Sequence, residues 1–223
     1  EGIDVSGIPV RPDCGSPFAN CWVDTEGKRS VAWTHNGLRF LTAAELPYDR
    51  IARAKILHLD GHHPEAALAA AKHAKKHGVL VNFDAGTIRP GVEELVELAD
   101  LLICSEYFAR TFTGEQDLEK ALRKLEKYRP RVLGVTMGCR GSMFLEHGEI
   151  LEVPIFDLPV VDTTGAGDSF HAGFAVRYLT DRNIARCARF ASAVSGIKCG
   201  KLGARAGLPT LAAVEAFLAS HPE

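Results

Sequence analysis

The chain has 223 residues, of which 46% are hydrophobic and 24% are charged, and its formal net charge is −2 at pH 7. These values suit one soluble globular domain with a sizeable core, and they give no electrostatic case for a nucleic-acid or anionic-membrane partner. No apolar run approaches the length of a membrane span, and no secretory signal is visible. The six cysteines are scattered without a Cys-x-x-Cys pair, as is typical of reduced thiols, so we expect a cytoplasmic protein.

Residues 3–34 are predicted to be rich in β-structure. Apolar runs at 18–23 and 31–33 flank a polar, glycine-containing turn at 24–29, and this pattern is typical of a β-hairpin. Two interpretations remain open from the residues alone: an ordinary edge hairpin of the core, and a hairpin that projects from the core.

From about residue 41, short apolar runs alternate with helical patterns. Pro64 at a first helical position and Gly78 after a last one are typical of the two ends of a helix. Because continuous apolar strands alternate with helices, the pattern predicts a parallel sheet that is covered on both faces. Strands are predicted at 55–60, 79–84, 100–104 and 131–136, and helices at 64–77, 92–99, 106–112 and 117–127.

Ligands of such sheets bind beyond the carboxyl ends of the strands. Four polar residues fall at these predicted ends, namely Asp60, Asp84, Ser105 and Thr136. After residue 136 the pattern changes to a turn and a hairpin, and then to helices only. The hairpin is predicted to pair 142–145 with 150–153, and the helices are predicted at 166–179, 183–198 and 211–218.

The segment 160–175 reads VVDTTGAGDSFHAGFA and joins an extended stretch to a helix. Phe170 and Phe174 have helical spacing, so a helix is predicted to begin near Ala166. Small residues let a ligand approach the backbone, and the first N–H groups of a helix attract an anion. Asp168 is unusual in an anion site, but it suits a base for a hydroxyl that attacks the anion. A bare Gly-x-Gly-Asp more often marks only a glycine-rich helix start.

The longer string favours the functional interpretation, because residues 162–170 closely resemble the C-terminal signature of the ribokinase-like (PfkB) carbohydrate kinases. The resemblance implies an α/β, ribokinase-like fold with a mostly parallel central sheet flanked by helices and a small β lid. It also implies transfer of the γ-phosphoryl group of ATP to a primary hydroxyl of a small sugar, with a ketose favoured. The implied catalytic residues are Asp168, which accepts the hydroxyl proton, and Gly165, Ala166 and Gly167, which hold the transferring charge.

Two further segments resemble nucleotide-binding loops of this family. Residues 136–141 (TMGCRG) resemble its Thr-x-Gly-x-x-Gly loop, although most Gly-x-x-Gly turns are only turns, and residues 195–205 resemble the loop that closes over adenine. The implied ATP-binding residues are Thr136, Gly138, Gly141, Lys198 and Gly203.

The resemblance also implies a possible potassium ion beside the anion site. In the family, backbone carbonyls of the adenine loop and of the signature segment often hold this ion. The matching carbonyls here belong to Asp162, Thr164 and Gly203.

Magnesium is expected with ATP, because phosphoryl transfer needs its charge. The family often has Asn-x-x-Glu to orient magnesium waters and phosphate, but here Ser105 and Phe108 stand at those two positions. Glu106 is the remaining acidic residue in this segment and is a candidate for contact with the substrate or its phosphate. The alternative is a plain helix start with Ser105 as N-cap and Glu106 in the first turn, so no metal ligand is assigned.

Three more residues are candidates for contact with the substrate or its phosphate. Residues 83–90 (FDAGTIRP) resemble the family's Asp-x-Asn-x-Arg region without its asparagine, which implies Asp84 and Arg89. A salt bridge between these two residues is the alternative. His62 follows a predicted strand end and is the third candidate, whereas a zinc site at His62 and His63 lacks a further ligand at suitable spacing.

The resemblance spans nearly all of the chain. It assigns residues 1–40 to lid strands and their connection, and residues 41–223 to the kinase core. Residues 1–7 resemble a family segment that follows several strands and helices, so we expect a preceding piece on the order of 70–80 residues. Lid strands of this kind often pair with another subunit, which implies a homodimer.

The residues around Lys198 and the serine at 105 are most similar to the ketohexokinase and sulfofructose kinase side of the family. Two other functions remain open. One is the same chemistry on a nucleoside or a vitamin precursor, and the other is a non-catalytic ligand-binding or regulatory homologue.

Overall fold

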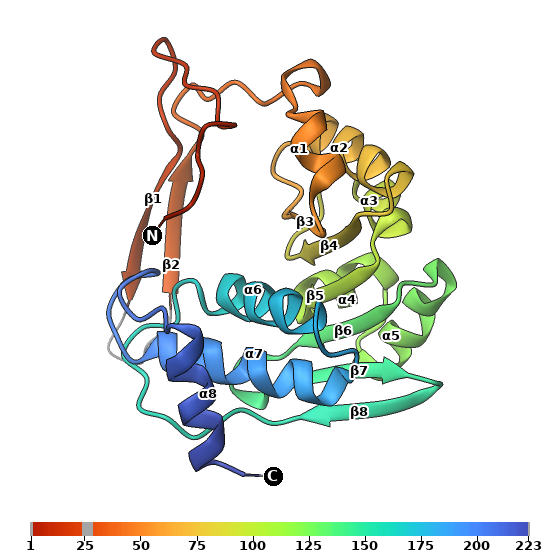
Figure 1. The fold of residues 1–223 in the computed structure, drawn as a ribbon, viewed down its shortest axis with the longest axis vertical. Coiled ribbons are helices and arrows are strands. Elements are labelled where there is room, and N and C mark those ends of the chain that lie inside the picture. Colours follow the sequence, from red (N-terminus) through yellow and green to blue (C-terminus); the bar gives the residue numbers. More distant parts are fainter. Residues whose placement is uncertain (1, 24–28, 223) are drawn as a thin grey trace.

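The computed structural model describes residues 2–23 and 29–222. Its central element is a six-stranded sheet in the order β3-β4-β5-β6-β7-β8, which confirms the predicted α/β architecture (Figure 1). The first four strands are parallel, and the last two continue the sheet as an antiparallel hairpin. The strands are β3 (Ile56–Leu59), β4 (Leu80–Ala85), β5 (Leu101–Ser105), β6 (Val132–Thr136), β7 (Ser142–Glu146) and β8 (Glu149–Val153).

Helices cover both faces of this sheet, as the alternating pattern predicts. One apolar core joins β-strand side chains to buried residues of α2 (Pro64–Lys76), α3 (Val92–Leu98), α4 (Glu106–Thr113) and α5 (Leu118–Leu125). A second core on the other face contains side chains of α6 (Ala166–Tyr178) and α7 (Ile184–Cys199). Helix α8 (Leu211–Ser220) packs on α7. A short helix α1 (Tyr48–Arg53), which the sequence analysis does not predict, packs on α2.

The N-terminal hairpin projects from the main body rather than joining its sheet (Figure 1). Strands β1 (Phe18–Val23) and β2 (Arg29–Thr34) pair only with each other and are antiparallel. The predicted turn between them, residues 24–28, lies outside the described residues. The strands have exposed apolar side chains on both faces, which are Phe18, Trp22, Val31 and Trp33.

The prediction of β-structure is wrong for residues 3–17, which form turns and irregular segments. Prolines at positions 9, 12 and 17 supply no N–H groups, so this stretch cannot complete a strand ladder. Local contacts organise it instead, since the Asp4 carboxylate accepts from the Ser6 amide at 2.9 Å and from Arg50 of α1 at 2.5 Å.

None of the helices in residues 2–23 and 29–222 is long and apolar enough to cross a membrane. The six cysteines are free thiols, and three of them, Cys104, Cys187 and Cys199, are buried. Burial raises the pKa of all three buried thiols, so they are held in the neutral form.

Helix α6 is attached to the sheet mainly by aromatic side chains, and this attachment can be tested. Phe174 is fully buried and stacks on Phe144 of β7 with ring centroids 5.4 Å apart. Replacing Phe174 by Ala should therefore lower the free energy of unfolding by about 3–5 kcal/mol. Denaturant unfolding measures this change. The matched control is Val176→Ala in the same helix, where the side chain is 57% exposed and little change is expected. A Phe174→Ala loss as small as that of the control would contradict the packing.

Candidate active site

The start of helix α6 has the geometry of an anion site. Gly165 is the N-cap residue with φ 79°, and a Cβ there would lie 3.1 Å from the Cβ of Ala204. The Ala166 amide donates to the Thr163 carbonyl at 3.0 Å. The next two amides, of Gly167 and Asp168, have no hydrogen-bond acceptor among the described residues. A Cβ at Gly167 would meet no heavy atom within 4 Å, so the approach to these amides is open.

Asp168 stands exposed in the first turn of this helix, beside the open amides. The Asp168 carboxylate also acts electrostatically on a polar side chain of the sheet, that of His58. Burial and the charge of His171 lower the pKa of His58 on β3, whereas the carboxylates of Asp84, Asp60 and Asp168 act in the opposite direction. The helix start and the carboxyl ends of β3 and β4 therefore form one electrostatic neighbourhood.

Asp84 and His171 form a buried pair that sequence reasoning does not predict. His171 is 1% exposed, and its Nε2 lies 3.2 Å from the Asp84 carboxylate. Burial acts to raise the pKa of Asp84, but the hydrogen bond from His171 and the charges of His171 and His58 outweigh it, so that pKa lies below its usual value. The sequence carries no local signal for this pair, because Asp84 and His171 lie far apart in the chain.

Arg89 does not pair with Asp84, so the salt-bridge alternative is wrong. Its Nη2 instead lies 3.2 Å from Nε2 of His62, at the ends of β4 and β3. The loop that holds His62 is fixed by its own amide, which donates to the Asp60 carboxylate at 2.9 Å. Two of the four candidate contacts to substrate or phosphate, Arg89 and His62, are therefore brought together.

The predicted nucleotide loop follows β6 directly. Thr136 ends this strand, and residues Gly138–Arg140 form a 3-10 turn. Gly138 and Gly141 have φ values of 59° and 86°. A Cβ at Gly141 would lie 2.2 Å from the Val153 carbonyl oxygen, so only glycine fits there. Space remains open beside Gly138, where a Cβ would meet nothing within 4 Å.

Glu106 is held by arginines rather than presented to a metal. Its carboxylate lies 2.5 Å from Arg140 and 3.3 Å from Arg110. The N-cap alternative is confirmed, because the Ser105 hydroxyl accepts from the Phe108 amide at 3.0 Å. The described part of the chain contains no group of three or more His, Cys, Asp or Glu side chains that could hold a metal ion.

Asp162 joins the helix start to the last loop of the chain. Its carboxylate accepts from the amides of Thr164 at 2.8 Å and Gly203 at 2.7 Å. These two hydrogen bonds, with smaller contributions that include the charge of Lys198, lower its pKa to about 2. The carboxylate is therefore ionised throughout the neutral range and keeps both segments in place.

Lys198 is fully buried at the end of α7, and its ammonium donates to the backbone oxygen of Asp162 at 2.9 Å. Its side chain is therefore directed into the fold, towards the segment that precedes α6. The oxygen that accepts this hydrogen bond belongs to one of the three carbonyls implied for potassium, that of Asp162.

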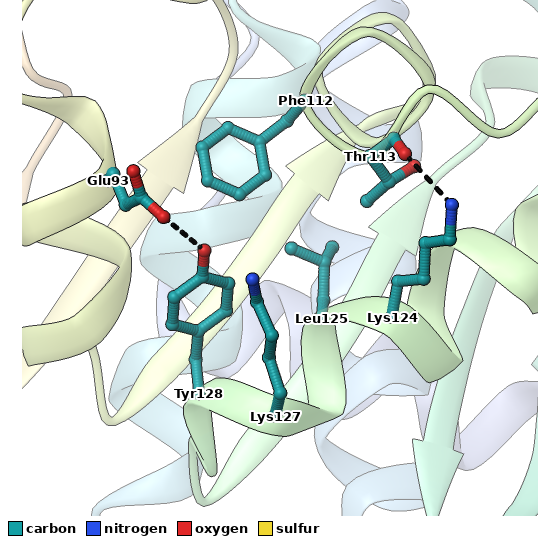
Figure 2. A pocket seen from close by; sticks show the side chains of 7 residues that line it. All are labelled: Glu93, Phe112, Thr113, Lys124, Leu125, Lys127 and Tyr128. Atoms are coloured by element: carbon teal, nitrogen blue, oxygen red, sulfur yellow. Dashed lines mark hydrogen bonds between the residues drawn. The ribbon is translucent and has the colours of Figure 1, made fainter.

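A separate pocket of about 260 Å³ lies between α3, α4 and α5 (Figure 2). In it the hydroxyl of Tyr128 donates to the Glu93 carboxylate at 2.8 Å, and Lys124 donates to the Thr113 carbonyl at 3.3 Å. None of the residues predicted to be catalytic or to bind ATP lines it. Its lining residues are Glu93, Phe112, Thr113, Lys124, Leu125, Lys127 and Tyr128.

Comparison with known proteins agrees with this geometry. The chain matches the pfkB family of carbohydrate kinases over residues 1–211. It is 30% identical to the ATP-dependent ribose-1-phosphate kinase of Halopiger xanaduensis, over 99% of this chain and 73% of that protein. It is 27% identical to a nucleoside kinase of Methanothermobacter thermautotrophicus, over 98% of this chain and 72% of that protein.

Among solved structures, the ribokinase from Thermotoga maritima matches with a TM-score of 0.80 and 27% identity, over 94% of this chain and 72% of that one. The predicted family and fold are thereby confirmed. The chain thus has the ribokinase-like fold and belongs to the pfkB family of carbohydrate kinases.

Proposed function

We propose that this protein transfers the γ-phosphoryl group of ATP to a primary hydroxyl of a small sugar. The observation that carries the proposal is the start of α6, where open amides and the exposed Asp168 carboxylate occupy one helix turn. Amides in this position stabilise negative charge, and a carboxylate beside them accepts a proton from the attacking hydroxyl.

Backbone amides and side chains have separate roles in this proposal. Within the predicted turn Gly165–Gly167, the open amide of Gly167, together with that of Asp168, faces the transferring phosphoryl group, whereas the Ala166 amide holds the turn through Thr163. The Asp168 carboxylate takes the hydroxyl proton as the new O–P bond forms and the bond to the ADP leaving group breaks. The open turn after Thr136 receives the remaining nucleotide phosphates on its backbone. Positioning and electrostatic stabilisation supply most of the catalysis in such a transfer.

Magnesium enters this proposal only as part of the nucleotide, whose phosphate charge it neutralises. Glu106 is committed to Arg140 and Arg110 and is therefore a link between the nucleotide loop and α4, not a metal ligand. Its role in the site is to hold the Arg140 side chain and, with it, the turn that precedes Gly141.

Replacing Asp168 by Asn should reduce kcat by roughly 10²–10⁴-fold, because the substitution keeps the shape but removes the base. Sugar-dependent release of ADP by the complete gene product measures the change. The matched control is Asp157→Asn, an exposed carboxylate on the preceding loop, for which near-normal turnover is expected. If Asp168→Asn also turned over at a near-normal rate, Asp168 would not be the base.

The acceptor is proposed to be a ketose, as the similarity to the ketohexokinase side of the family favours. The ribose-1-phosphate and nucleoside kinases among the relatives support the second candidate, a ribosyl compound or nucleoside. Arg89 and His62 at the strand ends are proposed to contact the acceptor or its phosphate.

A panel of ketoses, aldoses, ribose 1-phosphate and nucleosides should separate these acceptors by their kcat/KM values. Highest activity with a ketose would support the first choice, and highest activity with ribose 1-phosphate or a nucleoside would replace it. A folded protein that binds ATP but releases no ADP with any member would instead favour the non-catalytic, regulatory function.

The hairpin of β1 and β2 is proposed to act as a lid and to pair with a second copy of the chain. Its two faces differ in composition but both are apolar, with Phe18 and Trp22 on one face and Val31 and Trp33 on the other. One face can cover the acceptor while the other is buried by the partner. The exposed fractions of these four side chains, 53–62%, support such a role, because large apolar side chains in one patch favour association.

The proposed dimer predicts that Trp33→Ser shifts the protein towards a monomer. Light scattering after size-exclusion chromatography gives the mass directly. Val160→Ser is the control, because Val160 is 62% exposed but lies outside the hairpin. A wild-type protein that is monomeric over the concentrations tested would contradict the pairing.

We also propose that the protein works in the cytoplasm. All six cysteines are unpaired, including the exposed Cys21 and Cys139, and such thiols are typical of reducing compartments. ATP as the phosphoryl donor fits the same location.

A further inference from the structure

We propose that the buried ammonium of Lys198 is a built-in cation that positions the anion-binding turn of α6, so that phosphoryl transfer by this protein needs no monovalent metal ion. The inference rests on the proposed kinase function, but its structural part can be tested without activity. It assigns Lys198 as a positioning residue, because its ammonium acts through Asp162 and not on the reacting atoms.

The first observation is the burial of the charge. Lys198 is 0% exposed, and it is the only lysine or arginine among the buried residues of the described chain. No carboxylate lies within ion-pair distance of its Nζ in the part of the chain that the structure describes, and its contact is the backbone oxygen of Asp162 at 2.9 Å. An ammonium in such a place loses its hydration, which is costly. A methionine would fill the same volume without that cost, so the charge itself is the feature to explain.

The second observation is what the ammonium holds. Asp162 lies three residues before the N-cap Gly165, and its backbone amide donates to the Cys199 carbonyl at 3.1 Å. Its carboxylate binds the amides of Thr164 and Gly203. All of these contacts are made by Asp162, and the hydrogen bond from Lys198 is one of them. Together they connect the end of α7, the loop that follows it and the start of α6.

The third observation is that the loop after α7 packs closely against both Lys198 and the start of α6. A Cβ at Gly207 would lie 2.1 Å from the Lys198 carbonyl oxygen, and Ala204 packs against Gly165 at the start of α6. There is little freedom for the lysine to leave, because the loop covers it. The ammonium is thus held next to Asp162, three residues before the turn that receives the transferring phosphoryl group, where a positive charge favours negative charge.

The fourth observation concerns potassium. The expected ion would use the carbonyls of Asp162, Thr164 and Gly203, and the Asp162 carbonyl already accepts from Lys198. An ammonium and a potassium ion carry the same charge and both bind carbonyl oxygens, so the lysine fills the role that the ion would have. On this basis we expect phosphoryl transfer that does not depend on potassium.

The test compares the complete wild-type gene product with Lys198→Met, which keeps the length of the side chain and removes the charge. ADP release is measured with choline chloride, NaCl, KCl or NH₄Cl at one ionic strength. The wild-type rate should be the same in all four salts. Lys198→Met should lose roughly 10²-fold in kcat in choline chloride, as for loss of one positioned electrostatic group. It should regain part of that loss with K⁺ or NH₄⁺ and show a smaller change in KM.

The control is Lys120→Met, because Lys120 is exposed on α5 and lies outside the segments proposed to bind ATP or sugar. It should match the wild type in every salt. Two outcomes would overturn the inference: strong activation of the wild type by K⁺, or a Lys198→Met enzyme that is fully active in choline chloride.

Thermal unfolding supplies a readout that does not depend on turnover. The midpoint of the wild type should be equal in choline chloride and KCl, whereas that of Lys198→Met should be lower and should rise in KCl. A wild-type midpoint that rises in KCl would overturn the inference even if Lys198→Met failed to fold. Absence of sugar-dependent ADP release in every salt, with a wild-type midpoint indifferent to K⁺, would reject the kinase function but keep the built-in cation.

Discussion

The candidate site depends on one residue, Asp162, which fixes the backbone before helix α6. A helix start binds an anion only if its open amides point in a constant direction, and two amide hydrogen bonds to the Asp162 carboxylate provide this constraint. These bonds lower the pKa of Asp162 to about 2. Its ionised carboxylate therefore stabilises the fold fully at every pH above the ordinary pKa of an aspartate. That contribution is lost only as the pH falls towards 2, so the turn stays fixed at any physiological pH.

The parallel sheet then determines which groups meet this turn. Asp84 pairs in register with Ile103 and Ser105 with Thr136, so the carboxyl ends of β4, β5 and β6 lie along one edge. The side chains of helix α6 have different surroundings on its different faces. Phe170 and Phe174 are buried in the core below the sheet, while His171 reaches Asp84 and Asp168 stays exposed. Packing of the apolar face therefore sets the position of the catalytic candidate.

Local sequence patterns were enough to predict most helices and strands from residue 55 onward. Apolar periodicity, Pro64 at a helix start and glycines at helix ends can all be read from residues that are close together in the chain. The turn around Gly165 was predictable for the same reason. Contacts between residues that are distant in sequence could not be predicted in this way, namely His171 with Asp84 and Arg89 with His62. Their side-chain directions depend on how strands and helices pack. The burial of the lysine at 198 was hidden in the same way, because a lone lysine near a helix end is usually solvated.

The arrangement also explains how a chain with net charge −2 can offer an anion site. The two arginines near the nucleotide loop, Arg140 and Arg110, share the one carboxylate of Glu106, which offsets part of their charge. Much of the attraction for phosphate is therefore assigned to the open amides at α6 and the turn after β6, together with the buried Lys198 ammonium. Backbone donors act only at short range and in fixed directions, whereas exposed cations attract any anion. Such a site selects a ligand by the placement of its oxygens, which is the property that in-line transfer between two bound substrates requires.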